Sequence, residues 1–539
     1  MRGGTASSTP GAPAHAQDGN GSAPREDEGT PSGTAAGPSR ARLWIGRLVV
    51  LAAVAVGAIT LVATGNGVDR PALETAWQII DPEVLADDPL GSVWYLHTQP
   101  PTYNLVVGAI VWLDLPTAGA LYVVFVASLV GIGLLLHGLL VRWGVGPVTA
   151  GLIVGIALLN PSLLSTVTIA SYEVPVALLL VASLWAMQRY LDAPGTGWLL
   201  ATSALLTLTA LTRSLFNPPW VAVVLVLMLI ARPASRRQVL AAAAIPIVLI
   251  GGWMLKNEVL FGTPTTSSWL GFNMQRGIVA PLDADMVRDD ARAGEVSDLA
   301  LEYPWGTIEQ YEAWLDGCEP AHDHPAVSEP RKPDYRGLPV ANFNYECYLP
   351  LYSQAQEDAV TLAGRHPGRY LHDRAAALAM SYRYAEIGTD DTWLDTAYER
   401  LLWPVEVRIG MSDWNLPLFI GADESGLPLS ISVTLIGLSV FVGARGLVSV
   451  WRLARIGWRR RSDWPGYELV WLVVSLTTVV IILGGDLIEF GENGRFRSTL
   501  DPLLVAMPLA SLALVVRHWR ERRVPPASPA PLDEPVPAP

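Results

Sequence analysis

Residues 43–63 read LWIGRLVVLAAVAVGAITLVA, and this apolar stretch decides the fold. As a helix it is long enough to cross the hydrocarbon core of a membrane, which is roughly 30 Å thick. Arg40 and Arg42 stand just before it, and basic residues beside a span favour the cytoplasmic side. A long polar extension precedes it and no small-residue cleavage pattern follows before Asp69. The sequence therefore predicts an uncleaved anchor rather than a cleaved signal peptide.

Nine further apolar stretches follow, and the arginines of the chain orient them. The stretches lie near residues 117–141, 147–165, 172–190, 196–212, 217–231, 238–255, 428–450, 467–485 and 498–517. With the N-terminus inside, the arginine clusters between these stretches all fall in inner loops, as the positive-inside rule requires. The chain is predicted to be an all-α polytopic protein of the plasma membrane, with about ten transmembrane helices and both termini in the cytoplasm.

The composition excludes several other classes of protein. Hydrophobic residues make up 51% and charged residues 16% of the chain, against about 25% charged residues in soluble proteins. The net charge of -13 argues against a nucleic-acid binder, whose footprint is basic. The sequence has no phosphate-cradling glycine loop of the Walker or dinucleotide type, so direct use of ATP or NAD is unsupported.

The predicted spans divide the chain into five parts. They are a disordered cytoplasmic tail (1–42), an N-terminal transmembrane module (43–255) with its first outer loop (66–116), an extracytoplasmic domain (256–428), the C-terminal transmembrane helices (429–517) and a second disordered tail (518–539). The extracytoplasmic domain is expected to be mainly helical. Apolar residues at helical spacing predict two helices over 349–385, separated at Pro367.

Charged residues gather at the outer ends of the predicted spans, whose middles are free of Asp, Glu and Lys. The charged residues at the outer ends are Asp69, Glu173, Arg213, Lys256, Asp486 and Asp501. A coupled transporter is expected to carry ionisable groups near the midplane of the membrane. The pattern therefore favours chemistry at the outer surface over passage through the membrane.

The first outer loop holds two candidate catalytic features. Asp69 follows the first span closely, so its carboxylate is either a general base at headgroup height or a solvated loop residue. Further along, residues 97–104 read HTQPPTYN, and the two prolines predict a rigid junction before a helix. His97, Gln99 and Asn104 are displayed there, either to form a site or to cap the helix and hold the loop.

Three arginines depart from the inside bias. Arg213 lies in a tight outer turn, and Arg495 and Arg497 precede the last span. A guanidinium can bind two phosphate oxygens at once, whereas snorkelling to the headgroups is the alternative fate of such residues. Three exceptions on one face favour a phosphate site.

The chain has two cysteines, Cys318 and Cys347, both in the predicted extracytoplasmic domain. Oxidising conditions there favour a disulfide, which would stabilise the domain by roughly 3 to 4 kcal/mol, and two free thiols remain the alternative. The stretch His322-Asp323-His324 lacks a third ligand at recognisable spacing, so no metal site is predicted from it.

These features together resemble the GT-C superfamily of integral-membrane glycosyltransferases, in the branch of aminoarabinose transferase and protein O-mannosyltransferases. The resemblance is carried by Asp69 with the His97 to Tyr103 junction, by Arg213, by Lys256-Asn257 with the text of residues 261–273, and by Glu492 to Arg497 before the last span. One departure is that Arg70 follows Asp69, where the family commonly has a second acid. Glu74 or Asp81 could therefore hold the role of the base.

The resemblance implies inverting transfer of a sugar from a polyprenyl-phosphate donor on the extracytoplasmic face to a glycan, lipid or protein acceptor. Mannose and arabinose are the expected sugars, and a divalent metal is left open. Asp69 and His97 would be catalytic, with Arg213 and Arg497 neutralising the leaving phosphate. The other expected substrate-binding residues are Gln99, Tyr103, Asn104, Lys256, Glu492 and Arg495.

Two other functions stay open at the level of the sequence. A flippase or transporter of lipid-linked sugars would move the donor without cleaving the phosphate bond. A non-catalytic envelope assembly protein would bind a wall polymer through residues 256–428 and would not need Asp69.

Overall fold

The computed structural model describes most of the chain. The described residues are 39–63, 68, 73, 76–167, 170–335, 338–382, 406–409, 429–490 and 493–523. The described residues from Arg40 onward belong to one compact unit. Asp69, Glu74 and Glu492, which the sequence analysis singled out, lie outside the described residues.

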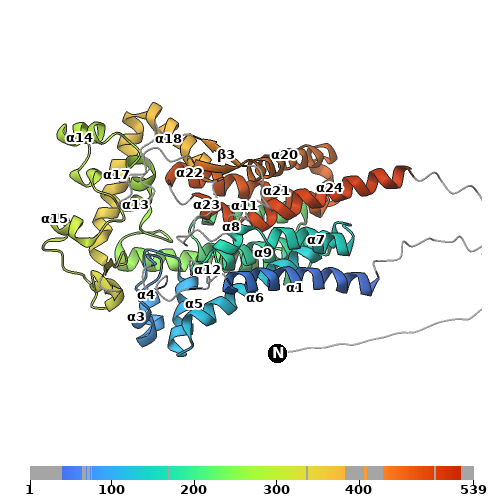
Figure 1. Cartoon of the computed structure of the whole chain (residues 1–539), viewed down its shortest axis with the longest axis horizontal. Coiled ribbons are helices and arrows are strands. Elements are labelled where there is room, and N and C mark those ends of the chain that lie inside the picture. The colour runs from blue at the N-terminus through green and yellow to red at the C-terminus, as the bar shows by residue number, and fades with distance from the viewer. Residues whose placement is uncertain are drawn as a thin grey trace, which may run out of the picture. The chain divides into compact units, whose positions relative to one another are not determined.

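Among the described residues, seven helical segments are long and apolar enough to cross a membrane, which confirms an all-α polytopic membrane protein. They are α1 (Arg40–Ala63), α6 (Thr117–Arg142), α9 (Glu173–Asp192), α12 (Arg236–Phe261), α20 (Val433–Ile456), the continuous segment Gly466–Ile488, and α24 (Asp501–Arg523). Figure 1 shows the long helices running side by side. The segment Gly466–Ile488 consists of α21 (Gly466–Val479), the π-helical turn η6 (Val480–Gly484) and α22 (Gly485–Ile488).

Three shorter apolar helices occupy the remaining predicted spans. They are α7 (Pro147–Leu158), α10 (Thr196–Thr212) and α11 (Pro218–Ala231). The span predicted over 147–165 is interrupted because Asn160 caps a separate short helix, α8 (Pro161–Ser165), with its side chain accepting from the Ser162 amide at 3.0 Å. At a rise of about 1.5 Å per residue, α7 is too short to cross alone, so ten crossings remain a prediction.

Glycines bring the first helix close to its neighbour in the bundle. A Cβ added to Gly151 of α7 would lie 2.4 Å from the carbonyl oxygen of Gly46 of α1. A Cβ added to Gly46 would lie 2.3 Å from the carbonyl oxygen of Pro147. Small residues permit this backbone approach, which suits helix packing where no water drives association.

The described residues of the predicted first outer loop (66–116) include three short helices. They are α3 (Pro82–Asp87), α4 (Pro89–Trp94) and α5 (Pro101–Trp112). Each begins with a proline at a position where no backbone amide is needed. The expected helix after the Pro100-Pro101 pair is thus present as α5.

We call the segment between α12 and α20 the outer insert, after its predicted side of the membrane. Its described residues form short helices and two small antiparallel sheets of two strands each. The helices are α13 (Leu270–Met274), the π-helical η1 (Gln275–Val279), α14 (Ala284–Arg292), η2 (Asp298–Leu301), η3 (Ile308–Tyr311), α15 (Glu312–Leu315), α16 (Pro325–Ser328), η4 (Glu346–Tyr348), α17 (Leu349–Arg365) and α18 (Pro367–Met380). The strands pair as β1 (Arg331–Tyr335) with β2 (Leu338–Ala341) and β3 (Glu406–Ile409) with β4 (Leu429–Ser432). Figure 1 shows α13, α14, α15, α17 and α18 gathered at one end of the long helices.

Two features of the insert follow from its sequence. The predicted break at Pro367 is confirmed, because α17 ends at Arg365 and α18 begins at Pro367. Cys318 and Cys347 form a disulfide with a Cα–Cα distance of 6.1 Å. Around it, a core of aromatic side chains that includes Phe272 and Tyr348 is fully buried.

The C-terminal part is completed by two short elements. Between α20 and α21 lies the 3-10 segment η5 (Trp458–Asp463), and before α24 lies α23 (Asn493–Ser498). Although α23 has six residues, it carries two of the predicted site arginines.

Candidate functional site

A cavity of about 390 Å³ lies where the first outer loop, the outer insert and the ends of the membrane helices meet. Four distant parts of the chain line it: Trp77, Gln78 and Gln99; Tyr172, Arg213, Ser214, Leu215 and Asn217; Thr265, Thr266, Ser267, Trp269, Leu270, Asn273, Arg276 and Trp305; and Val480, Gly484, Ile488, Glu489, Arg495 and Phe496. We call this the central cavity. Three of the predicted site residues, Gln99, Arg213 and Arg495, meet in its wall.

Arg213 reaches the central cavity because α10 ends just before it. Its backbone is extended, and its amide still donates to the Thr209 carbonyl as the helix cap. The side chain is only 3% exposed. Its guanidinium carbon lies 5.4 Å from the ring centre of Tyr172 and 4.5 Å from that of Phe496. Cation–π contacts of this kind hold the charge in place at the cavity wall.

Arg213 and Arg495 share one buried carboxylate, that of Glu173. Glu173 Oε1 lies 2.9 Å from Arg495 Nε and 3.7 Å from Arg213 Nη1. Glu173 is in the first turn of α9 and is fully buried, and a helix N-terminus favours a negative charge. Both arginines line the central cavity, while Glu173 lies behind them.

A second ion pair joins the outer insert to the segment after α22. Arg276 Nε and Nη2 lie 2.8 and 2.5 Å from Glu489 Oε1, and both residues line the central cavity. Arg276 belongs to the π-helical turn η1, where a Cβ on Gly277 would lie 2.4 Å from the Ile488 carbonyl oxygen. Glycine therefore permits the close approach that brings Arg276 to Glu489.

Both π-helical turns of the described chain border the central cavity. Arg276 comes from η1, and Val480 and Gly484 come from η6. Turns of this type are rare and occur frequently at functional sites, because the extra residue re-aims the side chains that follow.

One side of the central cavity is aromatic. The rings of Trp77 and Trp305 stack with centroids 5.1 Å apart, and Trp269 meets Trp305 edge-on at 4.9 Å. All three line the cavity. Indole faces present flat apolar area with a negative quadrupole, a surface that the C–H groups of a sugar ring can cover.

The charged side chains that line the central cavity are mainly cationic. Among the described residues they are Arg213, Arg276, Arg495 and the single carboxylate Glu489. Arginine binds phosphate oxygens through a planar fork of donors. The wall therefore suits an anion at the arginines and a ring with apolar faces at the tryptophans.

His97 lies outside the wall of the central cavity and links the first loop to the insert. Its Nε2–H donates to the Asn344 carbonyl at 3.0 Å, and its Nδ1 accepts from the Ser268 hydroxyl at 2.7 Å. Burial lowers the pKa of His97 to about 3, so the ring is uncharged. These contacts favour a structural role over proton transfer.

Three other predicted residues lie outside the cavity wall and bind backbone groups through their side chains. The Asn104 side chain accepts from the Ile80 amide at 2.8 Å and donates to the Gln78 carbonyl at 3.0 Å. The Tyr103 hydroxyl donates to the Ala170 carbonyl, and the Lys256 ammonium donates to the Leu96 carbonyl at 2.6 Å. None of the three lines the central cavity; Asn104 instead holds Gln78, which does.

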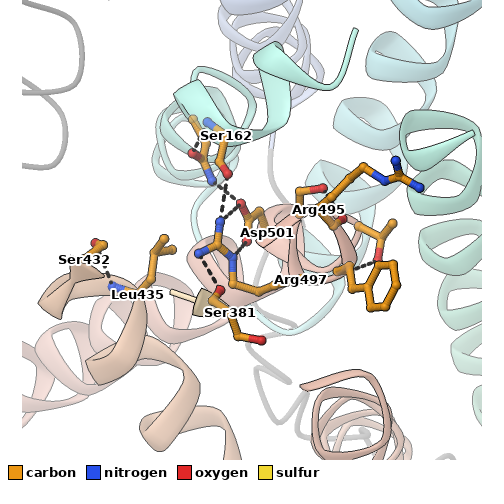
Figure 2. A network of polar contacts seen from close by, with 11 residues as sticks. Ser162, Ser381, Ser432, Leu435, Arg495, Arg497 and Asp501 are labelled. Atoms are coloured by element: carbon orange, nitrogen blue, oxygen red, sulfur yellow. Dashed lines mark hydrogen bonds and ion pairs between the residues drawn. The ribbon is translucent and has the colours of Figure 1, made fainter. Parts of the chain in front are cut away.

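Arg497 belongs to a buried network away from the central cavity (Figure 2). Its Nε lies 3.0 Å from Asp501 Oδ1, and its other nitrogens donate to Ser162 Oγ at 2.7 Å and the Ser381 carbonyl at 3.0 Å. Residues two apart on a helix face different ways, and Figure 2 shows Arg495 and Arg497 pointing apart. Arg497 thus joins α8, α18 and α24, while Arg495 reaches the cavity.

Asp81, the alternative base, caps α3 instead. Its Oδ1 accepts from the Glu83 amide at 2.8 Å and the Val84 amide at 3.4 Å. It borders a second cavity, also of about 390 Å³, beside Lys332. Lys332 donates to the Ala76 and Ile79 carbonyls at 2.7 and 2.6 Å, and burial lowers its pKa to about 8. Asp81 and Lys332 are thus both engaged in holding the first loop.

Arg276, Glu489 and the three tryptophans are not among the residues predicted from the sequence to form the site. Trp269 lies within residues 261–273, a stretch that contributes to the family resemblance, and Arg276 follows it closely. The sequence predicts no specific role for either side chain. Trp77, Trp305 and Glu489 come from separate loops with no motif around them. Their meeting is set by the tertiary fold.

Comparisons with known proteins add little to this geometry. No family model matches the chain, and no curated protein matches it. A crystal structure of ArnT from Cupriavidus metallidurans in the apo state is similar at 17% sequence identity, covering 84% of this chain and 78% of that chain, with a TM-score of 0.33. At that TM-score the likeness carries no argument about this chain.

Proposed function

We propose that this chain is an integral-membrane glycosyltransferase of the GT-C type. It would transfer a sugar from a polyprenyl-phosphate donor to an acceptor hydroxyl at the extracytoplasmic face of the plasma membrane. The observation that carries the proposal is the central cavity. Its wall contains both the arginines Arg213 and Arg495 and the tryptophans Trp77, Trp269 and Trp305.

The division of the cavity suits a glycosyl phosphate. The guanidinium groups of Arg213 and Arg495 would bind the phosphate, since arginine matches two of its oxygens. The indole faces of Trp77 and Trp305 would bind the sugar ring, with Asn273 and Gln99 available for its hydroxyls. Mannose and arabinose remain the proposed sugars, and a glycan, lipid or protein remains the proposed acceptor.

The reaction would be a displacement at the anomeric carbon. The acceptor oxygen forms the new bond to that carbon while the bond to the phosphate oxygen breaks, and the phosphate leaves with the electron pair. Negative charge grows on the phosphate in the transition state, so fixed cations in a shielded site lower the barrier. Arg213 and Arg495 would supply this stabilisation.

The proton of the acceptor hydroxyl must pass to a base. Asp69 remains the proposed base from the sequence, although it lies outside the described residues. Glu489 is a carboxylate in the wall of the central cavity and is a second candidate. Its ion pair with Arg276 holds it in place.

The proposed side of the membrane follows from the ends of the helices. Glu173, which holds the cavity arginines, is in the first turn of α9, and Arg189 is in its last turn. The last turns of α6 and α24 are basic as well, with Arg142 in α6. Basic ends favour the cytoplasm, which supports an extracytoplasmic position for the central cavity.

The test is sugar transfer by the full-length protein in lipid nanodiscs. Labelled polyprenyl-phosphate mannose and arabinose are supplied separately, with an envelope extract as the source of acceptor, and release of polyprenyl phosphate is measured with the labelled product. We expect Arg213→Ala to lower the rate by about 100-fold or more. Arg445→Ala is the matched control, because Arg445 is paired with a buried glutamate but does not line the central cavity.

Two outcomes would contradict the proposal. One is transfer by Arg213→Ala at the rate of the Arg445→Ala control. The other is movement of the intact donor across the bilayer by the wild type without cleavage of the phosphate bond, which would indicate a flippase.

A further inference from the structure

Behind the arginines of the central cavity lies a carboxylate that a bound substrate cannot reach. Glu173 has no exposed surface and does not line the cavity, whereas Arg213 and Arg495 do. Its Oε1 lies 2.9 Å from Arg495 Nε and 3.7 Å from Arg213 Nη1. Glu173 therefore acts on a ligand only through these two cations.

The three side chains together carry one net positive charge. Without the carboxylate, the same wall would present two positive charges to the cavity at a depth where water screens them poorly. The shared carboxylate thus halves the charge that an anion meets, while both arginines line the cavity. Phe496 and Tyr172 keep the Arg213 fork fixed from its faces.

The donor and the product of the proposed reaction differ in charge. A glycosyl polyprenyl phosphate is a phosphodiester with one negative charge. The polyprenyl phosphate released from it is a monoester, which carries about −1.5 to −2 near neutral pH. A doubly charged arginine wall would therefore hold the product more tightly than the donor and would slow its release.

We propose that Glu173 is a positioning residue that tunes the arginine pair, so that the wall binds the phosphodiester donor and still releases the phosphomonoester product. This inference rests on the proposed function for its substrate. It assigns Glu173 a role in turnover rather than in the chemical step. Glutamine at this position keeps an oxygen acceptor for Arg495 and removes the charge, so Glu173→Gln separates charge from shape.

The experiment is a double-mutant cycle with Glu173→Gln, Arg495→Gln and the two combined. Binding is measured in nanodiscs at pH 7.5 with a short-chain polyprenyl phosphate labelled at its tail, and with its methyl diester as a stand-in for the donor. We expect Glu173→Gln to bind the monoester about tenfold more tightly or better, with a smaller gain for the diester. We expect Arg495→Gln to bind the monoester about tenfold more weakly.

The double variant shows whether Glu173 acts through its negative charge or only through the shape of its side chain. It restores one net positive charge, that of Arg213, which keeps its cation–π contacts with Tyr172 and Phe496. The double variant is therefore expected to fold and to bind the monoester within about threefold of the wild type. If Glu173 only holds the arginine side chains in position, the double variant will bind the monoester no more tightly than Arg495→Gln does. That result overturns the proposal. Unchanged or weaker binding by folded Glu173→Gln overturns it as well.

A matched control lies elsewhere in the protein. Glu468 is also buried, also in the first turn of a helix, and also paired with two arginines, Arg445 and Arg452. Glu468→Gln is expected to leave monoester binding within about twofold of the wild type, because these residues do not line the central cavity. An equal gain in both variants would show a general effect of net charge and would overturn the proposal.

Turnover provides the second readout. We expect Glu173→Gln to slow steady-state transfer while the single-turnover rate stays near that of the wild type, since only product release is affected. The binding arms do not require sugar transfer. A tighter Glu173→Gln variant of a protein that transfers no sugar would therefore refute the proposed function and leave the assignment of Glu173 in place.

Discussion

Two buried glutamates, one near each end of α9, each hold two arginines. Glu173 begins α9. Glu468 lies in the first turn of α21, beside the other end of α9, where a Cβ on Gly466 would lie 2.7 Å from Gln188 Nε2. Their exposed fractions are 0% and 1%. Burial, helix position and charge are thus nearly the same in the two groups.

The hydrogen bonds of the two groups differ. The Glu468 carboxylate accepts from Arg445 and Arg452, each at 2.7 Å, and from the Ser449 hydroxyl at 2.8 Å. The contacts of Glu173 with its arginines are longer, at 2.9 and 3.7 Å, and those arginines face the central cavity. A buried ion pair by itself therefore does not mark a functional site. The difference is whether the cations also line a cavity of substrate size.

The largest expected effect separates the two arginine pairs by activity. Replacing Arg213 and Arg495 together with alanine should lower sugar transfer by about 1,000-fold or more, because both cations at the leaving phosphate are lost. Replacing Arg445 and Arg452 together should leave transfer within about threefold once the amount of folded protein is matched. Transfer is measured with the labelled donor. An equal loss of transfer in both double variants would contradict a special role for Arg213 and Arg495.

The next effect separates the two groups by stability. Glu468→Ala removes a buried carboxylate and leaves the partly buried Arg445 without its ion-pair partner, so we expect the free energy of unfolding to fall by about 2 to 3 kcal/mol. Binding of polyprenyl phosphate should stay within about twofold of the wild type. The measurements are thermal melting in detergent and a binding titration, and a variant that melts normally but loses binding would reverse the assignment.

A smaller effect tests the aromatic side of the central cavity. Trp77→Leu removes the ring that stacks on Trp305, and we expect KM for the donor to rise about tenfold while kcat stays within about threefold. Trp185→Leu is the control, since Trp185 packs edge-on against Trp198 near Arg189 at the opposite end of α9. A larger rise in KM for Trp185→Leu would argue against the tryptophans as the sugar surface.

The smallest effect concerns pH and His97. Its folded-state pKa of about 3 lies below the ordinary value of 6.5, so the unfolded chain binds more protons between these values. Stability from this group is present above pH 6.5 and is lost as the pH falls toward 3. Between pH 7.5 and 5.5 the wild type should lose about 1 kcal/mol more than His97→Gln. Melting curves that shift equally in both proteins would contradict this.

The sequence predicted the membrane fold well because length and composition suffice for long apolar helices. The stretches that became α1, α6 and α24 needed no tertiary information. The break between α7 and α8 was missed because Asn160 caps a new helix inside an otherwise apolar run. Capping by one side chain outweighed the hydropathy of the window.

The central cavity was predictable only in part. Arg213 and Arg495 stood out because arginine at the outer end of a span departs from the usual inside bias. Arg495 and Arg497 could not be told apart, because only the direction of α23 sends one into the cavity and the other into the buried network. Trp77 and Trp305 meet through packing between distant loops, which leaves no local pattern to read.

The two π-helical turns make the wall of the central cavity sensitive to the length of the chain. A π-helical turn contains one residue more than an α-helical turn at the same place. Deleting one residue from η6 would leave a regular α-helix from Gly466 onward but would rotate everything beyond it by about 100°. Glu489 follows directly after α22, so its carboxylate would swing away from Arg276. The same deletion elsewhere in an exposed loop would be absorbed, whereas here it would change which side chains face the ligand without weakening the helix.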